Sequence, residues 1–348
     1  MRFVQWWRMH NSLPRDGLIE TAYEPIAIPS PQEIRPLRLR ELLSMQIPSK
    51  GMLLTPILPE KGLVMLYGPR GVGKTYISLS VSYAVATGGA LMRWEAPQPR
   101  RVLYVDGEMP LVALRDRLDS IVKGSGFPAD EQAFQLLAAD HLDDGIPSLA
   151  SPQGQAFIEK FLDGVSLLTL DNVSTLAATA RDNDSDSWTP IQEWLLRLRR
   201  RGVSVLLNHH AAKGGQQRGT SRREDVLDTV IALRRPTDSQ ATEGARFEVH
   251  FEKTRGMKGD EAKPFEAKLI QDGGGIAWTT RDLADADMER VLALSAEGMS
   301  LRDIAEETGI PKSTVQRLKT RGAALAVSVP PSHSLEYGTV GQSRAHCG

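Results

Sequence analysis

The sequence predicts an α/β fold in which helices cover a mostly parallel sheet on both sides, followed by a small all-α domain. Two observations predict the sheet: short apolar runs rich in β-branched residues recur along the chain, and helical stretches lie between them. A compact helical segment near the C-terminus predicts the second domain. We therefore expect a flexible arm at 1–35, an α/β domain at 36–280, the all-α domain at 285–322 and a disordered tail at 323–348.

Four apolar runs are the expected parallel strands. Each is nearly apolar throughout, as a strand buried on both faces must be. They span residues 63–67, 102–105, 165–170 and 203–207. Two later runs, 247–251 and 265–270, alternate with period two and predict antiparallel strands at one edge of the sheet.

The helices expected around these strands span residues 75–87, 111–123, 153–162 and 190–201. Thr189 is the expected N-cap of the last one, with Pro190 at its first helical position. The glycines at 273–275 and the polar stretch up to Asp285 look like a domain boundary. The N-terminal arm either docks on a neighbour through Trp6 and Trp7 or is disordered.

Composition and charge exclude several classes of protein. The chain has 348 residues, of which 41% are hydrophobic and 24% charged, as in an ordinary globular protein. Its net charge of -1 supplies no global attraction to nucleic acid, so such contacts need local patches. Cys347 is the sole cysteine, which excludes a disulfide scaffold and fits a reducing cytoplasm. Neither a membrane span nor a signal peptide is evident, so we expect a soluble cytoplasmic protein.

One motif carries the most specific chemistry. The pattern G-x-x-x-x-G-K-T follows a predicted strand and precedes a predicted helix, which is the context that confirms a phosphate loop. Its backbone N–H groups and the helix N-terminus attract phosphate, Lys74 adds a charge for the β- and γ-phosphates, and Thr75 offers a hydroxyl to Mg²⁺. The loop consists of Gly68, Pro69, Arg70, Gly71, Val72, Gly73, Lys74 and Thr75.

Polar residues follow three of the predicted strands. Asp171 ends one of them and can hold Mg²⁺ through a water. Glu108 follows another and can orient or deprotonate the attacking water, with Asp106 as its local competitor. His209 and His210 follow a third, where a side chain can hydrogen-bond the γ-phosphate or simply cap the structure. A zinc site is the weaker interpretation, because no second cluster of ligands accompanies the histidines.

Four elements, in this order, resemble the RecA-like hexameric ATPases: the phosphate loop, Glu108, Asp171 and the pair His209 and His210. They are most similar to the RepA-type plasmid replication helicases and, more broadly, to the DnaB-type replicative helicases. The resemblance covers about residues 36–280. It implies a RecA-like P-loop NTPase fold that uses ATP and Mg²⁺. In that family the position of Glu108 is the general base, that of Asp171 supports Mg²⁺ and that of His210 senses the γ-phosphate.

Two later segments extend the resemblance. Arg218, followed by Gly-Thr-Ser and then Asp228, looks like the Arg-Gly-Ser-Ser stretch of this group. Lys253 and Arg255 look like its Lys-x-Arg motif, which reaches the γ-phosphate of a neighbouring subunit, although an exposed basic hairpin is the alternative. The resemblance implies a homo-oligomer, a hexamer in this family. The loop 213–217 then either faces single-stranded DNA or is a plain connector.

The C-terminal segment 288–321 predicts three short helices. Gly298 ends the first, Ser300 begins the second and Gly309 makes the next turn. The segment resembles a resolvase- or sigma-type helix-turn-helix, whose basic third helix suits the major groove of duplex DNA. A module for protein contacts is the alternative. The expected DNA-binding residues are Lys312, Ser313, Thr314, Gln316, Arg317, Lys319 and Arg321.

Three functions remain open at this point. The first is an ATP-driven motor on DNA, a plasmid or phage replication helicase. The second is a DNA-bound regulatory ATPase whose nucleotide state switches assembly without unwinding, and the third is a module that only organises a protein complex. Lys253 and Arg255 favour the motor, because activation in trans needs a ring. The helix-turn-helix favours the regulator, because a motor need not read sequence.

Overall fold

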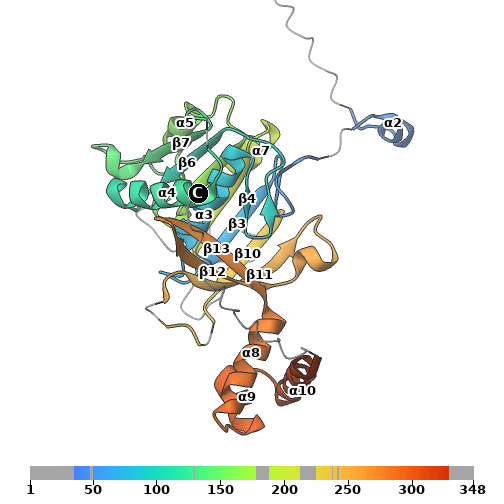
Figure 1. Cartoon of the computed structure of the whole chain (residues 1–348). Coiled ribbons are helices and arrows are strands. Elements are labelled where there is room, and N and C mark those ends of the chain that lie inside the picture. The colour runs from blue at the N-terminus through green and yellow to red at the C-terminus, as the bar shows by residue number, and fades with distance from the viewer. Residues whose placement is uncertain are drawn as a thin grey trace, which may run out of the picture. The chain divides into compact units, whose positions relative to one another are not determined.

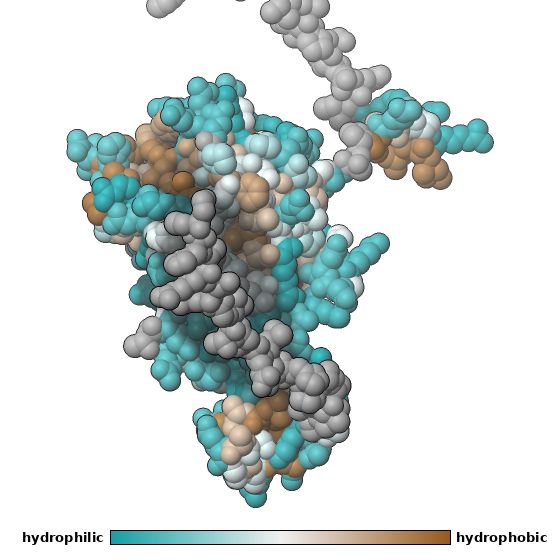
Figure 2. Space-filling view, viewed as in Figure 1, coloured by the Kyte–Doolittle hydropathy of each residue, from teal (hydrophilic) through white to brown (hydrophobic). Residues whose placement is uncertain are grey.

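The computed structural model describes residues 35–47, 50–128, 130–177, 188–211, 225–236, 238–240 and 243–328 (Figure 1). The chain divides into two compact units, 1–49 and 50–348. The described part of the first is helix α2 (Leu39–Ser44), in which Leu39 and Leu43 are exposed. Figure 2 shows the hydrophobic residues of this helix on one side and the hydrophilic ones on the other. Trp6 and Trp7 lie outside the described residues.

A nine-stranded sheet forms the centre of the second unit, in the order β13-β12-β11-β10-β3-β9-β8-β6-β7. All neighbours from β10 to β7 pair in parallel, whereas β11, β12 and β13 pair antiparallel. The predicted α/β class and the antiparallel edge are therefore confirmed. The strands are β3 (Leu63–Gly68), β6 (Val102–Asp106), β7 (Phe134–Ala138), β8 (Leu167–Asp171), β9 (Ser204–His210), β10 (Thr229–Arg234), β11 (Arg246–Thr254), β12 (Phe265–Asp272) and β13 (Gly275–Asp282).

Helices cover both faces of this sheet, and the alternation of side chains along β3 shows how. Val64 and Leu66 pack with helix α3, whereas Leu63 and Met65 pack with helices α5 and α7. Helix α3 is buried along most of its length, so it has no separate polar face, and even its serines at 78, 80 and 82 are buried. The helices of this domain are α3 (Lys74–Thr87), α4 (Leu111–Ser125), α5 (Pro152–Glu159), α6 (Val173–Leu176) and α7 (Trp188–Arg200).

Shorter elements complete the domain. They are the pairs β1 (Met52–Leu54) with β2 (Leu58–Pro59) and β4 (Ala90–Leu91) with β5 (Trp94–Glu95), and the 3-10 turns η1 (Ala139–His141) and η5 (Gly259–Ala262). No helix in the described part of the chain is long and apolar enough to cross a membrane.

The expected start of helix α7 is wrong. The helix begins at Trp188, so Thr189 and Pro190 lie inside its first turn and Thr189 is not the cap. The reason is packing: Trp188, Ile191 and Leu195 are all buried in the same core cluster, so the apolar face begins before the proline.

The glycines at 273–275 are not a domain boundary. Gly273 and Gly274 have positive φ values of 54° and 89° and form the turn of the β12–β13 hairpin. Strand β13 then packs against α4 so closely that a Cβ on Gly124 would lie 1.9 Å from the carbonyl oxygen of Ile276. Trp278 of the same strand donates from Nε1 to Ser80 Oγ of α3 at 3.1 Å. The sheet therefore continues to Asp282.

The helical domain follows directly from β13. Its helices are α8 (Leu283–Ala296), α9 (Leu301–Thr308) and α10 (Lys312–Ser328), and its core is Val291, Ile304, Val315 and Leu318. Ser300 caps α9 by accepting from the backbone N–H of Asp303, and Gly309 ends that helix with a φ of 68°, as the sequence predicts. Helix α10 continues past residue 322, the expected end of the domain, because good helix formers follow Gly322.

Candidate functional site

The parallel strands end at one edge of the sheet, and the predicted site residues lie there. In the strand register Gly68 pairs with His210, and Asp106 pairs with Asp171. Glu108 follows in the turn after Asp106. The structure thus brings the phosphate loop together with three of the predicted strand-end residues, as the geometry of parallel sheets requires.

The phosphate loop depends on its glycines. Gly71 and Gly73 have φ values of 72° and 109°, which side chains with a Cβ rarely adopt. A Cβ on Gly73 would also lie 2.9 Å from the Cβ of Ala245, and one on Gly68 would lie 2.8 Å from the Leu233 carbonyl. The loop therefore needs glycine both for its turn and for its close contact with the neighbouring strands.

Lys74 lies at the centre of this loop. Its side chain is buried, and its Nζ donates to the carbonyl oxygens of Gly68 at 3.0 Å and Pro69 at 2.9 Å. Burial lowers the pKa of Lys74 to about 8, although the negative charges of Asp171 and Glu108 oppose the shift. A buried ammonium group held by carbonyl dipoles at a helix N-terminus fits an anionic ligand such as a polyphosphate.

A series of buried side-chain hydrogen bonds, which begins on strand β9, holds Asp171. Asn208 Nδ2 donates to Ser78 Oγ at 2.8 Å, Ser78 Oγ lies 2.9 Å from Tyr104 OH, and Tyr104 OH donates to Asp171 Oδ2 at 2.7 Å. Burial raises the pKa of Tyr104 well above its usual range, so the tyrosine stays protonated and can donate. Sequence reasoning missed Tyr104 because it lies inside an apolar strand run.

The two acids after β6 have different environments. Asp106 is buried, and its Oδ1 accepts the backbone N–H groups of Glu108 at 2.9 Å and Met109 at 2.6 Å. Burial raises the pKa of Asp106 to about 6. The Glu108 side chain is instead 55% exposed at the rim of the site. Asp106 therefore anchors the turn, and Glu108 is the carboxylate that extends from it.

The two histidines face different neighbours, as adjacent residues of a strand do. His210 Nε2 lies 3.6 Å from Glu108 Oε2, whereas His209 Nδ1 lies 3.2 Å from Ser174 Oγ. Burial, with a smaller contribution from Lys74, lowers the pKa of His210. No group of three or more metal-ligating side chains occurs among the described residues, so the histidines form no cluster there.

Two further residues at this edge were not predicted. Asn172 directly follows Asp171, and its Nδ2 contacts both Glu108 Oε2 and His210 Nε2. Arg235 follows β10, a strand that the sequence analysis did not recognise, and its Nη2 donates to the carbonyl oxygen of Arg70 at 3.2 Å. The position of Asn172 beside Asp171 was the available signal, but an asparagine there also has a simple capping explanation.

Lys253 and Arg255 do not join the site of their own chain. They lie at the end of β11, which pairs with the beginning of β10. The phosphate loop follows the other end of the parallel strands, so the two cations lie on the opposite side of the sheet's strand ends from it. Both donate to the carbonyl oxygen of Asp225, at 3.3 Å and 3.0 Å respectively. Arg218 and the loop 213–217 lie outside the described residues.

The predicted DNA-binding residues all lie on helix α10. Lys312, Ser313, Gln316, Arg317 and Arg321 are exposed, whereas Thr314 and Lys319 are half-buried. Arg321 is held to Asp285 of α8 at 3.0 Å.

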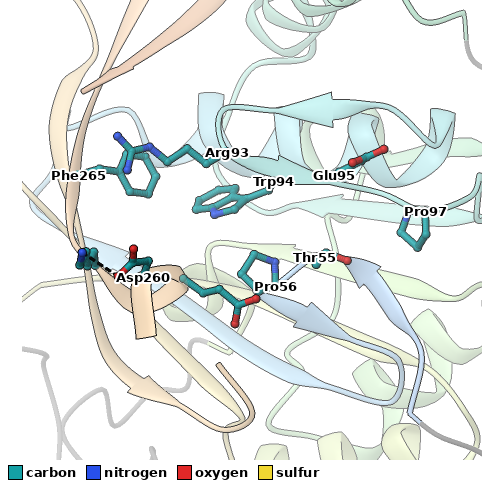
Figure 3. Close-up of a pocket in the computed structure, with 10 residues that line it drawn as sticks. Thr55, Pro56, Arg93, Trp94, Glu95, Pro97, Asp260 and Phe265 are labelled. Carbon is teal, nitrogen blue, oxygen red and sulfur yellow. Dashed lines mark ion pairs between the residues drawn. The ribbon is translucent and has the colours of Figure 1, made fainter. Parts of the chain in front are cut away.

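A separate hollow of about 590 Å³ lies away from the phosphate loop, between the β4–β5 hairpin and the turn η5 (Figure 3). Arg93 lies over the ring of Phe265 at 4.6 Å, and Trp94 packs edge-on against the same ring at 5.9 Å. Asp260 stands on the opposite wall in Figure 3. None of the residues that line this hollow belongs to the predicted phosphate site.

A glycine-rich loop with a buried lysine, at the edge of a mostly parallel sheet where a strand-end aspartate also lies, defines a P-loop ATPase domain. Residues 28–216, just over half of the chain, match the family model described as an AAA domain, and the chain belongs to that family. Residues 290–319 match the IclR helix-turn-helix domain, so the C-terminal module matches that type rather than the expected resolvase or sigma type.

Among solved structures, a KaiC-like protein from the hyperthermophilic archaeon Pyrococcus horikoshii OT3 is similar to this chain. The two are 16% identical, with a TM-score of 0.47, and the match covers 65% of this chain and 93% of the other.

Proposed function

We propose that this protein binds ATP with Mg²⁺ and hydrolyses it to do work on DNA, as a replication motor of the RepA type. The observation that carries the proposal is the convergence of Lys74, Asp171 and Glu108 at one edge of the sheet. Such convergence supplies a charge for the phosphates, a carboxylate for the metal and a carboxylate for the attacking water.

Each residue then has one role in the proposed reaction. Lys74 holds the β- and γ-phosphates, and Thr75 and Asp171 hold the Mg²⁺, which when bound neutralises charge on the phosphate oxygens. Glu108 accepts the proton of the attacking water, because its carboxylate extends to the rim of the site, whereas Asp106 is buried and its Oδ1 accepts two backbone N–H groups of the turn. His210 lies beside Glu108, where it contacts the γ-phosphate.

We further propose that the active site is shared between subunits of a ring, most simply a homohexamer. Lys253 and Arg255 lie at the opposite edge of the sheet from their own phosphate loop, so they are placed to act on a neighbour rather than within the chain. A cation supplied in this way neutralises charge that develops on the γ-phosphate during transfer.

The helical domain is proposed to bind duplex DNA through α10, whose exposed cations and amides suit phosphate and base contacts. One observation favours the second candidate, a DNA-bound regulatory ATPase. Arg290 of α8 pairs with Asp238 at 3.1 Å, and Asp238 also pairs with Arg246 of β11 at 3.2 Å. Ion pairs therefore join the helical domain to the loop between β10 and β11, which begins beside the phosphate loop at Arg235.

The test compares three variants with the wild type. Lys74→Ala should abolish nucleotide binding, because the phosphates lose their charged partner. Glu108→Gln should bind ATP normally and lose turnover, by about 10²-fold or more, because an amide cannot accept the proton. Lys123→Ala removes an exposed cation that pairs only with Asp119 of its own helix among the described residues, and should behave as the wild type.

ATP affinity, steady-state hydrolysis, duplex binding and strand displacement are measured on the same preparations. Near-normal turnover in Glu108→Gln would remove Glu108 from the role of base. Hydrolysis without strand displacement, together with sequence-selective duplex binding, would replace the motor with the regulatory ATPase.

A further inference from the structure

Asn172 connects three strand ends of the site through one side-chain amide. It follows β8 directly and is buried. Its Oδ1 accepts the backbone N–H of Thr175 at 3.0 Å, which caps helix α6. Its Nδ2 contacts Glu108 Oε2, after β6, and lies 3.1 Å from His210 Nε2, at the end of β9. The two hydrogens of the amide are therefore directed at Glu108, the proposed base, and at His210, the proposed phosphate sensor.

The partners fix which way this amide points. A backbone N–H can only donate, so the atom facing Thr175 must be the oxygen of Asn172. The nitrogen then faces Glu108 and His210 and can only donate to them. His210 Nε2 must accept, so the proton of the neutral ring lies on Nδ1, which has no hydrogen-bond partner among the described residues. The hydrogen-bond pattern thus selects one tautomer of His210.

We propose that Asn172 is a positioning residue for ATP hydrolysis, whose amide holds the Glu108 carboxylate and the His210 ring in one fixed arrangement beside the phosphate loop. This inference rests on the proposed function, because it assigns Asn172 a part in the same reaction. The simpler alternative is that Asn172 only caps α6.

The physical reason lies in the exposure of Glu108. Its side chain is 55% exposed. The hydrogen bond from its backbone N–H to Asp106 fixes the backbone but does not fix the carboxylate. Without the contact from Asn172, the carboxylate is free to move among rotamers directed toward solvent. A displacement of about 1 Å in a reacting group can cost about 10²-fold in rate. Turnover should therefore depend on Asn172 even where binding does not.

Two substitutions separate positioning from capping. Asn172→Asp keeps an oxygen for the Thr175 N–H, since aspartate and asparagine cap helices equally well, but it loses both donor hydrogens. Asn172→Ala loses the donors without adding a charge next to Glu108. The matched control, Thr175→Ala, removes the hydroxyl that lies 3.3 Å from Asn172 Oδ1 and leaves both donors in place.

Both Asn172 variants should lower kcat by about 10- to 100-fold, while KM and the nucleotide Kd stay within about threefold of the wild type. Thr175→Ala should keep nearly the full kcat. A loss of turnover in Asn172→Asp alone would overturn the proposal, because it would show repulsion of Glu108 rather than loss of the donors. A loss of turnover in Asn172→Ala with nearly full kcat in Asn172→Asp would overturn it in favour of capping, because the aspartate keeps the oxygen that accepts the Thr175 N–H.

A second readout needs no nucleotide. In the nucleotide-free wild type labelled with ¹⁵N-histidine, His210 should show the tautomer protonated at Nδ1, with its signals assigned by comparison with His210→Gln. In Asn172→Ala this preference should disappear. A wild type that binds ATP without turnover would overturn the proposed function. An active wild type, with kcat and the His210 tautomer unchanged by Asn172→Ala, would overturn the inference alone.

Discussion

Lys74 illustrates at the residue scale how burial prepares a charge for one kind of ligand. Its pKa is lowered to about 8, mainly by burial. Phosphate oxygens beside the ammonium favour its charged form, so a bound nucleotide raises this pKa again. Below about pH 8 the lysine is already protonated and binds without proton uptake. Above it, binding must take up a proton.

We therefore predict that the Kd for ATP, at saturating Mg²⁺, is flat below about pH 8 and rises by up to about tenfold per pH unit above it. Calorimetry in buffers of different ionisation enthalpy should show proton uptake that approaches one proton per nucleotide. Lys74→Arg stays charged throughout and should show a weaker but pH-independent Kd. A flat wild-type Kd up to pH 9.5 would contradict the lowered pKa.

The sequence predicted which residues converge on the phosphate loop, because the ends of parallel strands must share an edge. It did not predict the residues that hold them. Tyr104 lies within an apolar run and Asn208 just after one, so their polar contacts could not be distinguished from strand burial. Asn172 has a capping role that any asparagine at a helix start can have. Support of this kind depends on which strands become neighbours in the fold, and that order is not local in sequence.

At the scale of elements, the sequence analysis missed three strands of the nine-stranded sheet, β7, β10 and β13. The last strand, β13, begins after two glycines and mixes polar with apolar residues, and only its first two residues, which pack against α4, are buried. Strand β10 is a six-residue run between segments without periodicity, and it is buried by its neighbours β3 and β11. Partners supplied by the fold stabilise both, so local propensity was insufficient.

The end of strand β11 supports a prediction about assembly, because Lys253 lies on this end and Arg255 directly follows it, away from their own phosphate loop. Arg255→Ala should spare ATP binding and assembly and lower hydrolysis by about 10³-fold or more. Mixing it with Lys74→Ala subunits should restore part of the turnover, since at mixed interfaces one subunit supplies an intact phosphate loop and the other supplies Arg255.

The control for this experiment is Lys263→Ala, which removes an exposed cation paired with Asp260. This variant should keep full turnover, and mixtures that carry it should recover as much turnover as mixtures that do not. Co-assembly is checked by native mass spectrometry. Mixed oligomers that form but stay inactive at every ratio would show that Arg255 does not act across an interface.

At the scale of the whole molecule, the described contacts of the phosphate site all come from residues before α8, and the exposed cations of α10 come after it. A chain ending at Asp282 keeps all nine strands of the sheet. It should hydrolyse ATP within about threefold of the full chain and lose sequence-selective duplex binding, because the phosphate and base contacts are proposed to come from α10. A chain ending at Gly274 removes β13 from α4 and should fail to fold.

The measurement is a titration of both chains against a pool of duplexes at several salt concentrations, with Arg317→Ala and Arg321→Ala in the full chain. Arg317 is exposed and makes no ion pair within the described part of the chain, whereas Arg321 is paired with Asp285. If Arg317 contacts a phosphate, its removal lowers the slope of log affinity against log salt concentration by about one and weakens binding to all sequences alike. If Arg317 contacts a base, its removal relaxes the sequence preference at one position. Arg321→Ala should change binding less, because that side chain must first leave Asp285 to reach DNA. A chain ending at Asp282 that selects the same duplexes with the same affinity would show that α10 does not read the DNA, and the helical domain would then be a module for protein contacts.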